Sequence, residues 1–182
     1  MTGPIRDYPG RMPQPSASDR PADQVDRLVE AWGRERPDLD LSPMEVLSRV
    51  TRVSHHLDQL RRGTFAAHDL EPWEFDVLAA LRRAGAPYEL SPGRLIRETL
   101  VTSGTMTNRV DRLVGRGLVT RLPDPEDRRG VLVRLTDAGR EAVDGALAGL
   151  LDREQGLLSA LGVGDRRRLA SLLRQLSVAV ES

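Results

Sequence analysis

The sequence predicts a mainly α-helical fold with one small β-hairpin, and three observations carry this prediction. Apolar residues recur every three or four positions through most of the chain after residue 20, which is the spacing of a buried helix face. Proline and glycine stand where such segments begin and end. Two short segments of alternating apolar and polar residues, 118–122 and 131–135, flank the polar stretch PDPEDRRG, a pattern typical of a hairpin with a long tip.

The N-terminal region is predicted in two parts. Residues 1–20 are rich in proline, serine and charge, which is typical of a disordered tail. Residues 21–37 then predict a short extra amphipathic helix, which ends at Pro37. The apolar side of this helix consists of Val25, Leu28, Val29 and Trp32.

Residues 42–182 are predicted to form the main domain. Within it, about 70–136 has the order helix, helix, short turn, helix and hairpin, which is the order of a winged helix-turn-helix. Two longer apolar helical regions flank this module, at 42–62 and 137–180. They are too long to bury their apolar faces within so small a module. We therefore expect a homodimer joined through these N- and C-terminal helices.

Composition excludes several classes of protein. The 182 residues carry 27 basic side chains, all arginine, and 27 acidic ones, so no partner follows from the overall charge. The absence of cysteine excludes disulfides, Cys-ligated zinc and thiol redox sensing. No apolar run approaches the ~20 residues that span a bilayer, and the N-terminus lacks the apolar core of a secretory signal. We expect a cytoplasmic protein without cofactor, metal or membrane contact.

The segment TSGTMTNRVDRL, residues 102–113, is unusual for a helix, because small hydroxyl and amide residues are poor helix formers. Four apolar residues nevertheless share the face expected to lie on the core: Met106, Val110, Leu113 and Val114. The other side then presents small polar groups that can approach DNA and bond base edges or phosphates. Residues 94–121 also hold six arginines and two acids, a local charge of +4. The candidate DNA contacts here are Thr102, Ser103, Gly104, Thr105, Thr107, Asn108 and, to a phosphate, Arg112.

The hairpin tip DPEDRRG supplies a second candidate contact. An arginine between two strands can place its guanidinium in the minor groove, where the negative potential favours it. A solvated turn fits the same residues, so the tip favours DNA binding only together with the preceding helix. The candidate residues of the tip are Asp127, Arg128 and Arg129.

The stretch GTMTNRVDRLVGRGLVTRLPDPEDRRGVLVRLTDAGRE resembles the MarR family of dimeric winged-helix regulators, and the resemblance covers about residues 42–180. In that family an Asp-x-Arg pattern at the wing supports and supplies the minor-groove arginine. This pattern falls here on Asp127 and Arg129. The resemblance implies a homodimer on double-stranded DNA, in which each recognition helix contacts one half of a pseudo-palindromic operator, with half-site centres ~10 bp apart.

The extra helix at 21–37 makes the chain similar to the family members that respond to urate. The positions that match that subgroup are Trp32, Asp76, Arg83, Arg109 and Arg121. A planar anion can stack on Trp32 while guanidinium groups neutralise its charge; Arg109 is assigned to this ligand rather than to DNA. We expect an Asp76–Arg121 ion pair that ties the site to the wing. An entering anion would disturb this pair and lower the affinity for DNA.

Other interpretations stay open. The effector of such a regulator could be another purine, an organic acid, a phenolic compound or pH. If the effector is pH, His55 and His56, which lie beside the apolar seam of 42–62, are candidates for a dimer interface that senses protonation. The alternative is that the two histidines are partly exposed and have no such role. A protein–protein interaction module is a further alternative. An enzyme using these histidines or His68 finds no supporting motif, so we predict that the chain is not an enzyme.

Overall fold

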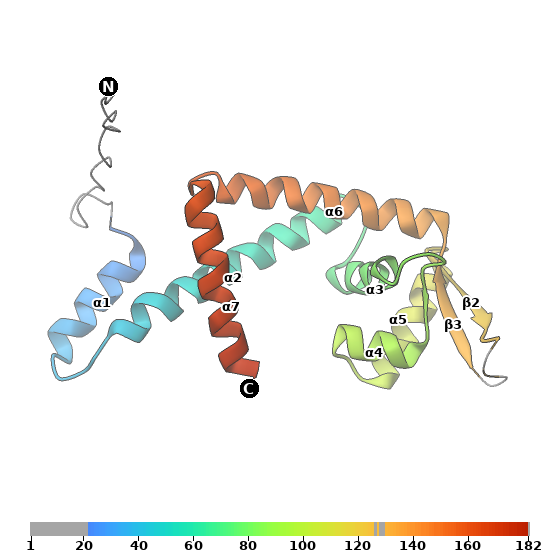
Figure 1. Ribbon diagram of the computed structural model, residues 1–182, viewed down its shortest axis with the longest axis horizontal. Helices are drawn as coiled ribbons and strands as arrows, with labels where there is room; N and C mark the ends of the chain where they lie inside the picture. The colour runs from blue at the N-terminus through green and yellow to red at the C-terminus, as the bar shows by residue number, and fades with distance from the viewer. Residues whose placement is uncertain (1–21, 126, 128–129, 182) are drawn as a thin grey trace, which may run out of the picture. The chain divides into compact units, whose positions relative to one another are not determined.

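The structure is a computed structural model that describes residues 22–125, 127 and 130–181. The predicted N-terminal tail and the wing residues Arg128 and Arg129 lie outside the described residues. The elements in chain order are α1 (Gln24–Glu35), α2 (Ser42–Ala66), α3 (Pro72–Arg83), β1 (Glu89–Leu90), α4 (Pro92–Thr99), α5 (Ser103–Gly115), β2 (Val119–Pro123), β3 (Val131–Leu135), α6 (Asp137–Leu158) and α7 (Val163–Glu181) (Figure 1). The prediction of a mainly helical fold with a small antiparallel hairpin is confirmed, and a third strand, β1, adds to it.

The chain divides into two compact units, residues 1–55 and 56–182, and α2 runs through the division. In the first unit the Asp23 carboxylate caps α1 by accepting the backbone N–H groups of Val25 at 2.7 Å and Asp26 at 3.0 Å. This cap places the start of α1 at Gln24, three residues after the predicted start. Of the predicted apolar side only Val25 is buried, because a single helix covers α1 within the described part of this unit.

The predicted apolar seam of α2 is largely uncovered in the single chain. Val46, Val50 and Val53 are 57%, 38% and 57% exposed. The helix starts beside Asp40, whose carboxylate accepts the backbone N–H and the hydroxyl of Ser42, both at 3.0 Å. An apolar stripe of this length in contact with water is typical of a surface that another chain covers.

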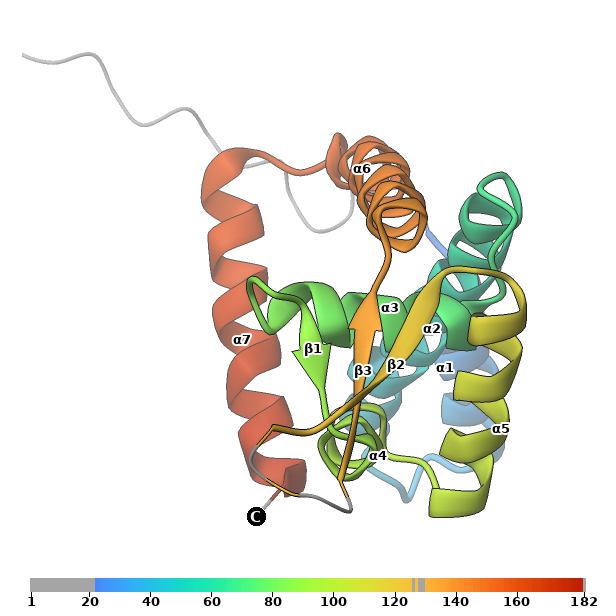
Figure 2. The same cartoon turned by 90° about the vertical axis from the view of Figure 1, so that its right-hand side faces the viewer.

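The second unit contains a three-stranded antiparallel sheet in the order β1-β3-β2 (Figure 2). Strands β2 and β3 form the predicted hairpin, in which Val119 lies opposite Leu135. Strand β1 has two residues, which are too few for an alternating pattern to predict. Leu90, Val133 and Leu135 are buried on the face of the sheet that meets the core.

Helix α3 lies at the centre of the core of the second unit and packs against α4, α6 and the sheet. Its residues Val77, Leu78 and Leu81 are fully buried, and Leu95 of α4 and Val143 of α6 belong to the same buried cluster. Helix α4 packs on α5, and α5 packs on β2. The helix-turn-helix and the wing are therefore parts of one packed body, and the core fixes the orientation of α5.

Gly139 allows α6 to begin directly beside the wing. The Thr136 hydroxyl caps α6 by accepting the Gly139 backbone N–H at 3.0 Å, and it donates to the Gly117 carbonyl at 2.8 Å. The backbone N–H of Thr136 donates to the Leu118 carbonyl at 3.1 Å. A Cβ at Gly139 would overlap this Leu118 carbonyl oxygen. The glycine of the LTDAGR sequence is therefore required by the close approach of two backbones.

Helix α7 has no buried residue, and the second half of α6 also leaves apolar side chains in water. The exposed leucines of the two helices are Leu147, Leu151, Leu157, Leu158, Leu169, Leu172, Leu173 and Leu176. Such a concentration of exposed apolar side chains is typical of an interaction surface.

Candidate functional site

Three apolar residues attach α5 to the core. Met106, Val110 and Leu113 are at most 2% exposed. Val114, predicted for the same face, is 38% exposed, so that part of the prediction is wrong. At 3.6 residues per turn, Val114 lies about 80° round the helix from Met106, whereas Val110 and Leu113 lie within about 40° of it. The buried stripe is therefore narrow, and most of the helix surface faces away from the core.

The N-terminal half of α5 presents small polar side chains to solvent, as predicted. The Thr102 hydroxyl accepts the Thr105 backbone N–H at 3.3 Å and lies 2.9 Å from the Thr105 hydroxyl. The Thr107 hydroxyl donates to the Ser103 carbonyl at 3.1 Å. The Thr102 cap stabilises the start of α5, and the Thr107 hydroxyl is satisfied within the helix. The predicted contacts that are exposed here are Thr102, Ser103, Gly104, Thr105, Thr107, Asn108 and Arg112.

A tryptophan at the start of α3 lies under two arginines of α5. The guanidinium carbon of Arg112 is 4.7 Å, and that of Arg109 5.5 Å, from the centre of the Trp73 ring. The Trp73 indole N–H donates to the Glu71 carboxylate, which also accepts a 3.2 Å hydrogen bond from Arg112. This hydrogen bond from Trp73 and the nearby Arg112 charge lower the pKa of Glu71. Neither Trp73 nor Glu71 was predicted from the sequence.

Trp73 and the two arginines also line a hollow on the exposed side of α5. The residues around it are Trp73, Gly104, Thr105, Asn108, Arg109 and Arg112. Arg109 was predicted to face the ligand with Asp76 and Arg83, but these two line a different hollow. Arg109 therefore lies with the predicted DNA-contacting residues.

Acidic residues from other elements neutralise much of the local positive charge. Arg116 donates to the buried Glu74 carboxylate at 2.6 Å, and to the Asp69 carbonyl and carboxylate, also at 2.6 Å. Glu74 is 1% exposed, so this contact anchors the end of α5 to α3 and to the loop before it. Arg116 is consequently a structural residue, and the charge of +4 counted along the sequence overstates the positive charge at this surface.

The wing carries a further ion pair. Arg121 of β2 donates to Asp111 of α5 at 2.6 Å. The prediction of an Asp76–Arg121 pair is therefore wrong in this structure, because β2 packs against α5 and Asp111 is the acid within reach. At the wing tip the Asp124 backbone N–H donates to the Gly130 carbonyl at 3.0 Å. Asp127 is described, whereas its predicted neighbours in DNA binding, Arg128 and Arg129, are not.

Asp76 and Arg83 share a second hollow, as their spacing of two helical turns predicts. They line it together with Arg61 of α2 and with Glu98 and Leu100 from α4 and its C-terminal end. Arg83 lies 3.6 Å from the Glu98 carboxylate, which joins α3 to α4. Arg61, which was not predicted from the sequence, adds a second positive charge, and the two arginines of the hollow balance its two acids, Asp76 and Glu98.

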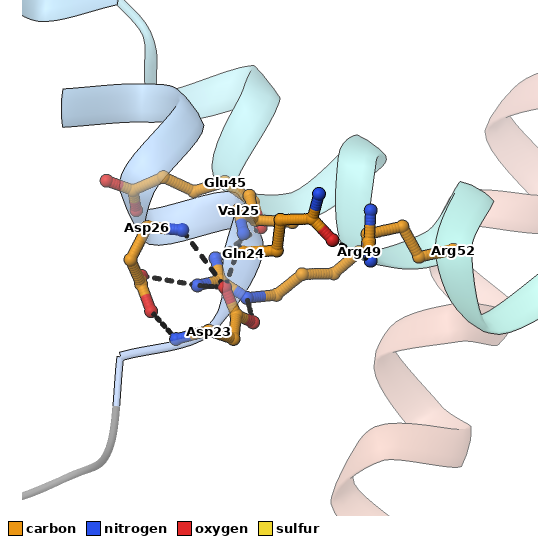
Figure 3. Close-up of polar contacts among 7 residues, drawn as sticks. All are labelled: Asp23, Gln24, Val25, Asp26, Glu45, Arg49 and Arg52. Carbon is orange, nitrogen blue, oxygen red and sulfur yellow. Dashed lines mark hydrogen bonds and ion pairs between the residues drawn. The ribbon is translucent and has the colours of Figure 1, made fainter. Parts of the chain in front are cut away.

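Trp32 belongs to the first unit and is 46% exposed on α1. Its helix is fastened to α2 by Arg49, whose guanidinium binds the Asp23 carboxylate at 2.8 and 3.1 Å and also binds Asp26 (Figure 3). The backbone N–H of Asp26 and the Arg49 side chain lower the pKa of Asp23 to about 2. Arg52 adds a hydrogen bond to Gln24. The helix that carries Trp32 therefore has a defined place on α2.

Three other expectations concern titratable side chains and membranes. His55 and His56 are both exposed on α2, and their pH-sensing role stays a prediction. Within the described residues, His, Asp and Glu side chains form no cluster of three or more that could hold a metal ion. In the same part of the chain no helix combines the length and apolar character that crossing a membrane requires.

Comparison with known proteins relates this geometry to a family. Residues 68–130 match the sequence profile of the MarR family. The chain is 37% identical to the HTH-type transcriptional regulator PecS of Dickeya dadantii, over 82% of this chain and 90% of that protein. A mutant E. coli MarR solved in complex with operator DNA is 28% identical, with a TM-score of 0.61 over 85% of this chain and 99% of the other. The structure of Bordetella bronchiseptica BpsR, described as the mechanism for regulation of its DNA binding by 6-hydroxynicotinic acid, is 29% identical, with a TM-score of 0.60 over 72% and 92%.

Proposed function

This chain belongs to the MarR family of transcriptional regulators, and we propose that it is a homodimeric repressor that releases its operator when a small anion such as urate binds. The observation that carries the proposal is the exposed polar half of α5, which Met106, Val110 and Leu113 hold against the core. A relative of the same fold, E. coli MarR, has been solved on operator DNA. Membership of a family of transcriptional regulators also favours a regulator over an enzyme.

The proposed DNA contacts come from α5 and the wing. Thr102, Ser103, Gly104, Thr105, Thr107 and Asn108 contact base edges or nearby phosphates, because they are small, exposed and close to the helix N-terminus. Arg112 binds a phosphate. Arg129 enters the minor groove beside the recognition helix, with Asp127 as its support and Arg128 next to it.

A second copy of the chain covers the apolar faces of the terminal helices. Exposed leucines on α6 and α7 and the valine seam of α2 supply the apolar area that a stable dimer buries. Two recognition helices related by a two-fold axis then contact two half-sites of a pseudo-palindrome.

The ligand site is the hollow at Asp76 and Arg83, with Arg61 as an added positive charge. A planar anion can bind here, because guanidinium groups pair with its charge. The match to the urate-responsive subgroup adds the exposed ring of Trp32 as a stacking partner. The regulation of BpsR by 6-hydroxynicotinic acid shows that a small aromatic acid can control DNA binding in a relative of this fold. Urate is the specific proposal, from the match to the urate-responsive subgroup.

Release of DNA follows from the ion pair between α3 and α4. An anion bound to Arg83 competes with Glu98, which lies 3.6 Å from that guanidinium. Loss of this pair shifts α4 relative to α3, and α4 packs directly on the recognition helix. The Arg121–Asp111 pair carries the same displacement from α5 to the wing. Ligand binding therefore favours a conformation with lower DNA affinity.

The proposal is tested by fluorescence anisotropy with a labelled duplex from the region upstream of the chain's own gene. We expect binding at 0.15 M salt and an apparent Kd that rises at least fivefold with urate. Arg83→Gln should abolish the response to urate, whereas Arg140→Gln, which removes an exposed arginine paired with Asp137, should keep it. Urate should also quench tryptophan emission in the natural chain and not in Trp32→Phe.

Each alternative gives a different result in the same assay. Release by 6-hydroxynicotinate or another organic acid, and not by urate, would replace urate as the effector. Release on acidification alone would favour His55 and His56 as the sensor. Absence of binding to the upstream duplex at any salt concentration would overturn the repressor proposal and leave the protein–protein module.

A further inference from the structure

The start of α3, where Glu71 is the N-cap residue, meets the middle of α5 at the surface of the second unit. Glu71 and Trp73 meet Arg109 and Arg112 at the surface, beside the exposed glycine and threonine of the recognition helix. We propose that this contact sets the DNA affinity. Trp73 positions the two guanidinium groups for DNA, and the Glu71 carboxylate occupies the place on Arg112 that a DNA phosphate takes. The inference rests on the proposed function of α5 in DNA binding.

Trp73 is suited to position the arginines because it is itself fixed. Its ring is partly buried and packs against the core, and its indole N–H is tied to the Glu71 carboxylate. Arg109 and Arg112 lie three positions apart on α5, so both extend over the same ring. An arginine held on an aromatic face has lost part of its side-chain freedom before DNA arrives, which lowers the entropy cost of the contact.

Glu71 is suited to act as a competitor that DNA can displace. A carboxylate and a phosphate present similar oxygen acceptors to a guanidinium. The Arg112–Glu71 pair is 3.2 Å long, and its side chains are 54% and 58% exposed, which describes a weak surface ion pair. The carboxylate is ionised at neutral pH, since the Trp73 hydrogen bond and the Arg112 charge lower the pKa of Glu71. Binding a phosphate therefore exchanges one weak pair for a stronger one.

The proposal is testable because Glu71 and Trp73 have opposite effects on operator affinity. Glu71→Gln keeps the shape of the side chain and a hydrogen-bond acceptor for Trp73, and it frees Arg112. Operator affinity should rise about two- to fivefold at low salt, which corresponds to about 0.4–1 kcal/mol and lies within the range of an exposed ion pair. Trp73→Leu removes the aromatic face from two arginines, and the affinity should fall about three- to tenfold.

A matched control distinguishes the loss of the Glu71–Arg112 pair from the effect of a changed net charge. Glu30→Gln removes the same charge from another exposed pair, Glu30–Arg34, of the same 3.2 Å length on α1. It should leave the affinity within about twofold of the natural chain. The decisive readout is a double-mutant cycle: the gain from Glu71→Gln should vanish in an Arg112→Gln background, because Glu71 acts through Arg112.

Fluorescence supplies a readout that does not depend on Trp73→Leu folding normally. The chain has two tryptophans, so Trp32→Phe leaves Trp73 as the only one. Its emission should change when a DNA phosphate replaces the Glu71 carboxylate on Arg112, because that carboxylate also accepts the indole N–H of Trp73. The proposal is overturned if Glu71→Gln binds no more tightly than the natural chain, if its gain persists without Arg112, or if Glu30→Gln produces the same gain. Failure of the natural chain to bind any duplex would instead overturn the proposed function.

Discussion

Replacing Gly139 by alanine should destabilise the junction between the wing and α6. An added methyl group at this position would meet atoms that are already closely packed. It would overlap the Leu118 carbonyl oxygen, and it would lie 3.0 Å from the Leu118 carbonyl carbon and 2.8 Å from a Leu135 methyl group. Leu135 can turn, but the Leu118 carbonyl is fixed by the 3.1 Å hydrogen bond from the Thr136 backbone. The backbones of the two elements must therefore separate.

The magnitude follows from these contacts. Forcing one methyl group into a closely packed site costs about 1–3 kcal/mol, and the cost is at the upper end where the obstacle is backbone. The higher helix propensity of alanine offsets about 0.5–1 kcal/mol of it. We expect a net loss of about 2 kcal/mol in the free energy of unfolding. In a chain of this length each kcal/mol shifts Tm by about 2–4 °C, so Tm should fall by about 4–8 °C.

The same helix provides the control. A Cβ at Gly156 of α6 meets nothing within 4 Å, so Gly156→Ala should stabilise the chain by about 0.5–1 kcal/mol. Circular dichroism melts and urea unfolding of the two variants measure both changes against the natural chain. A Gly139→Ala variant that melts at or above the natural chain would refute the close-approach argument. Operator affinity of this variant, measured well below its Tm, should also fall, because the displaced junction carries the wing.

Three further substitutions test the ion pairs of Arg116 and Arg49 and the role of the wing. Arg116→Ala leaves the buried Glu74 unpaired, and urea unfolding should show a loss of about 2–4 kcal/mol, below that of a fully buried pair because the Arg116 side chain is 34% exposed; an unchanged midpoint would contradict the anchoring role. Arg49→Ala should speed hydrogen exchange in α1. In the natural chain the folded-state pKa of Asp23 is about 2, against an ordinary 3.8, so α1 protection should be constant from pH 8 to 5 and decline as pH falls from about 4 to 2; a loss above pH 5 would point to another group. Arg129→Ala should weaken operator binding and reduce the slope of log K against log salt by about 0.9, and an unchanged slope would remove Arg129 from the DNA contact.

Most elements of the second unit could be predicted from local sequence, because the residues that begin and end each element and the spacing of its apolar residues lie within the element itself. Gly85 closes α3 in a left-handed conformation with a φ of 79°, and Ser91 caps α4, both as the residue types indicate. Strand β1 was missed because two residues have no measurable period. Val114 was misplaced because the buried stripe of α5 is narrower than its run of apolar residues.

The candidate site was harder to predict because its contacts join distant segments. Arg112 and Glu71 are 41 residues apart, and Arg116 and Glu74 are 42 apart, so no local pattern records either pair. Residues 94–121 carry a charge of +4 along the sequence, but acids outside this range neutralise two of the arginines, Arg112 and Arg116. The residue types and their faces were predictable from periodicity, whereas their ionic partners required the packed structure.

The two proposed sites lie at opposite ends of the same helix, and both use exposed ion pairs. Glu71 at the start of α3 pairs with Arg112 of the recognition helix, and Arg83 at its end lies 3.6 Å from Glu98 of α4. Each arginine can exchange its carboxylate partner for an incoming anion, a DNA phosphate at one end and the effector at the other. Exposed pairs contribute little to stability, so either exchange is possible without unfolding the core around Leu78. Because α3 packs on α4 and α4 on α5, an exchange at Arg83 reaches the helix that carries Arg112. Linkage then requires reciprocity: the factor by which the effector lowers DNA affinity is the factor by which DNA lowers effector affinity.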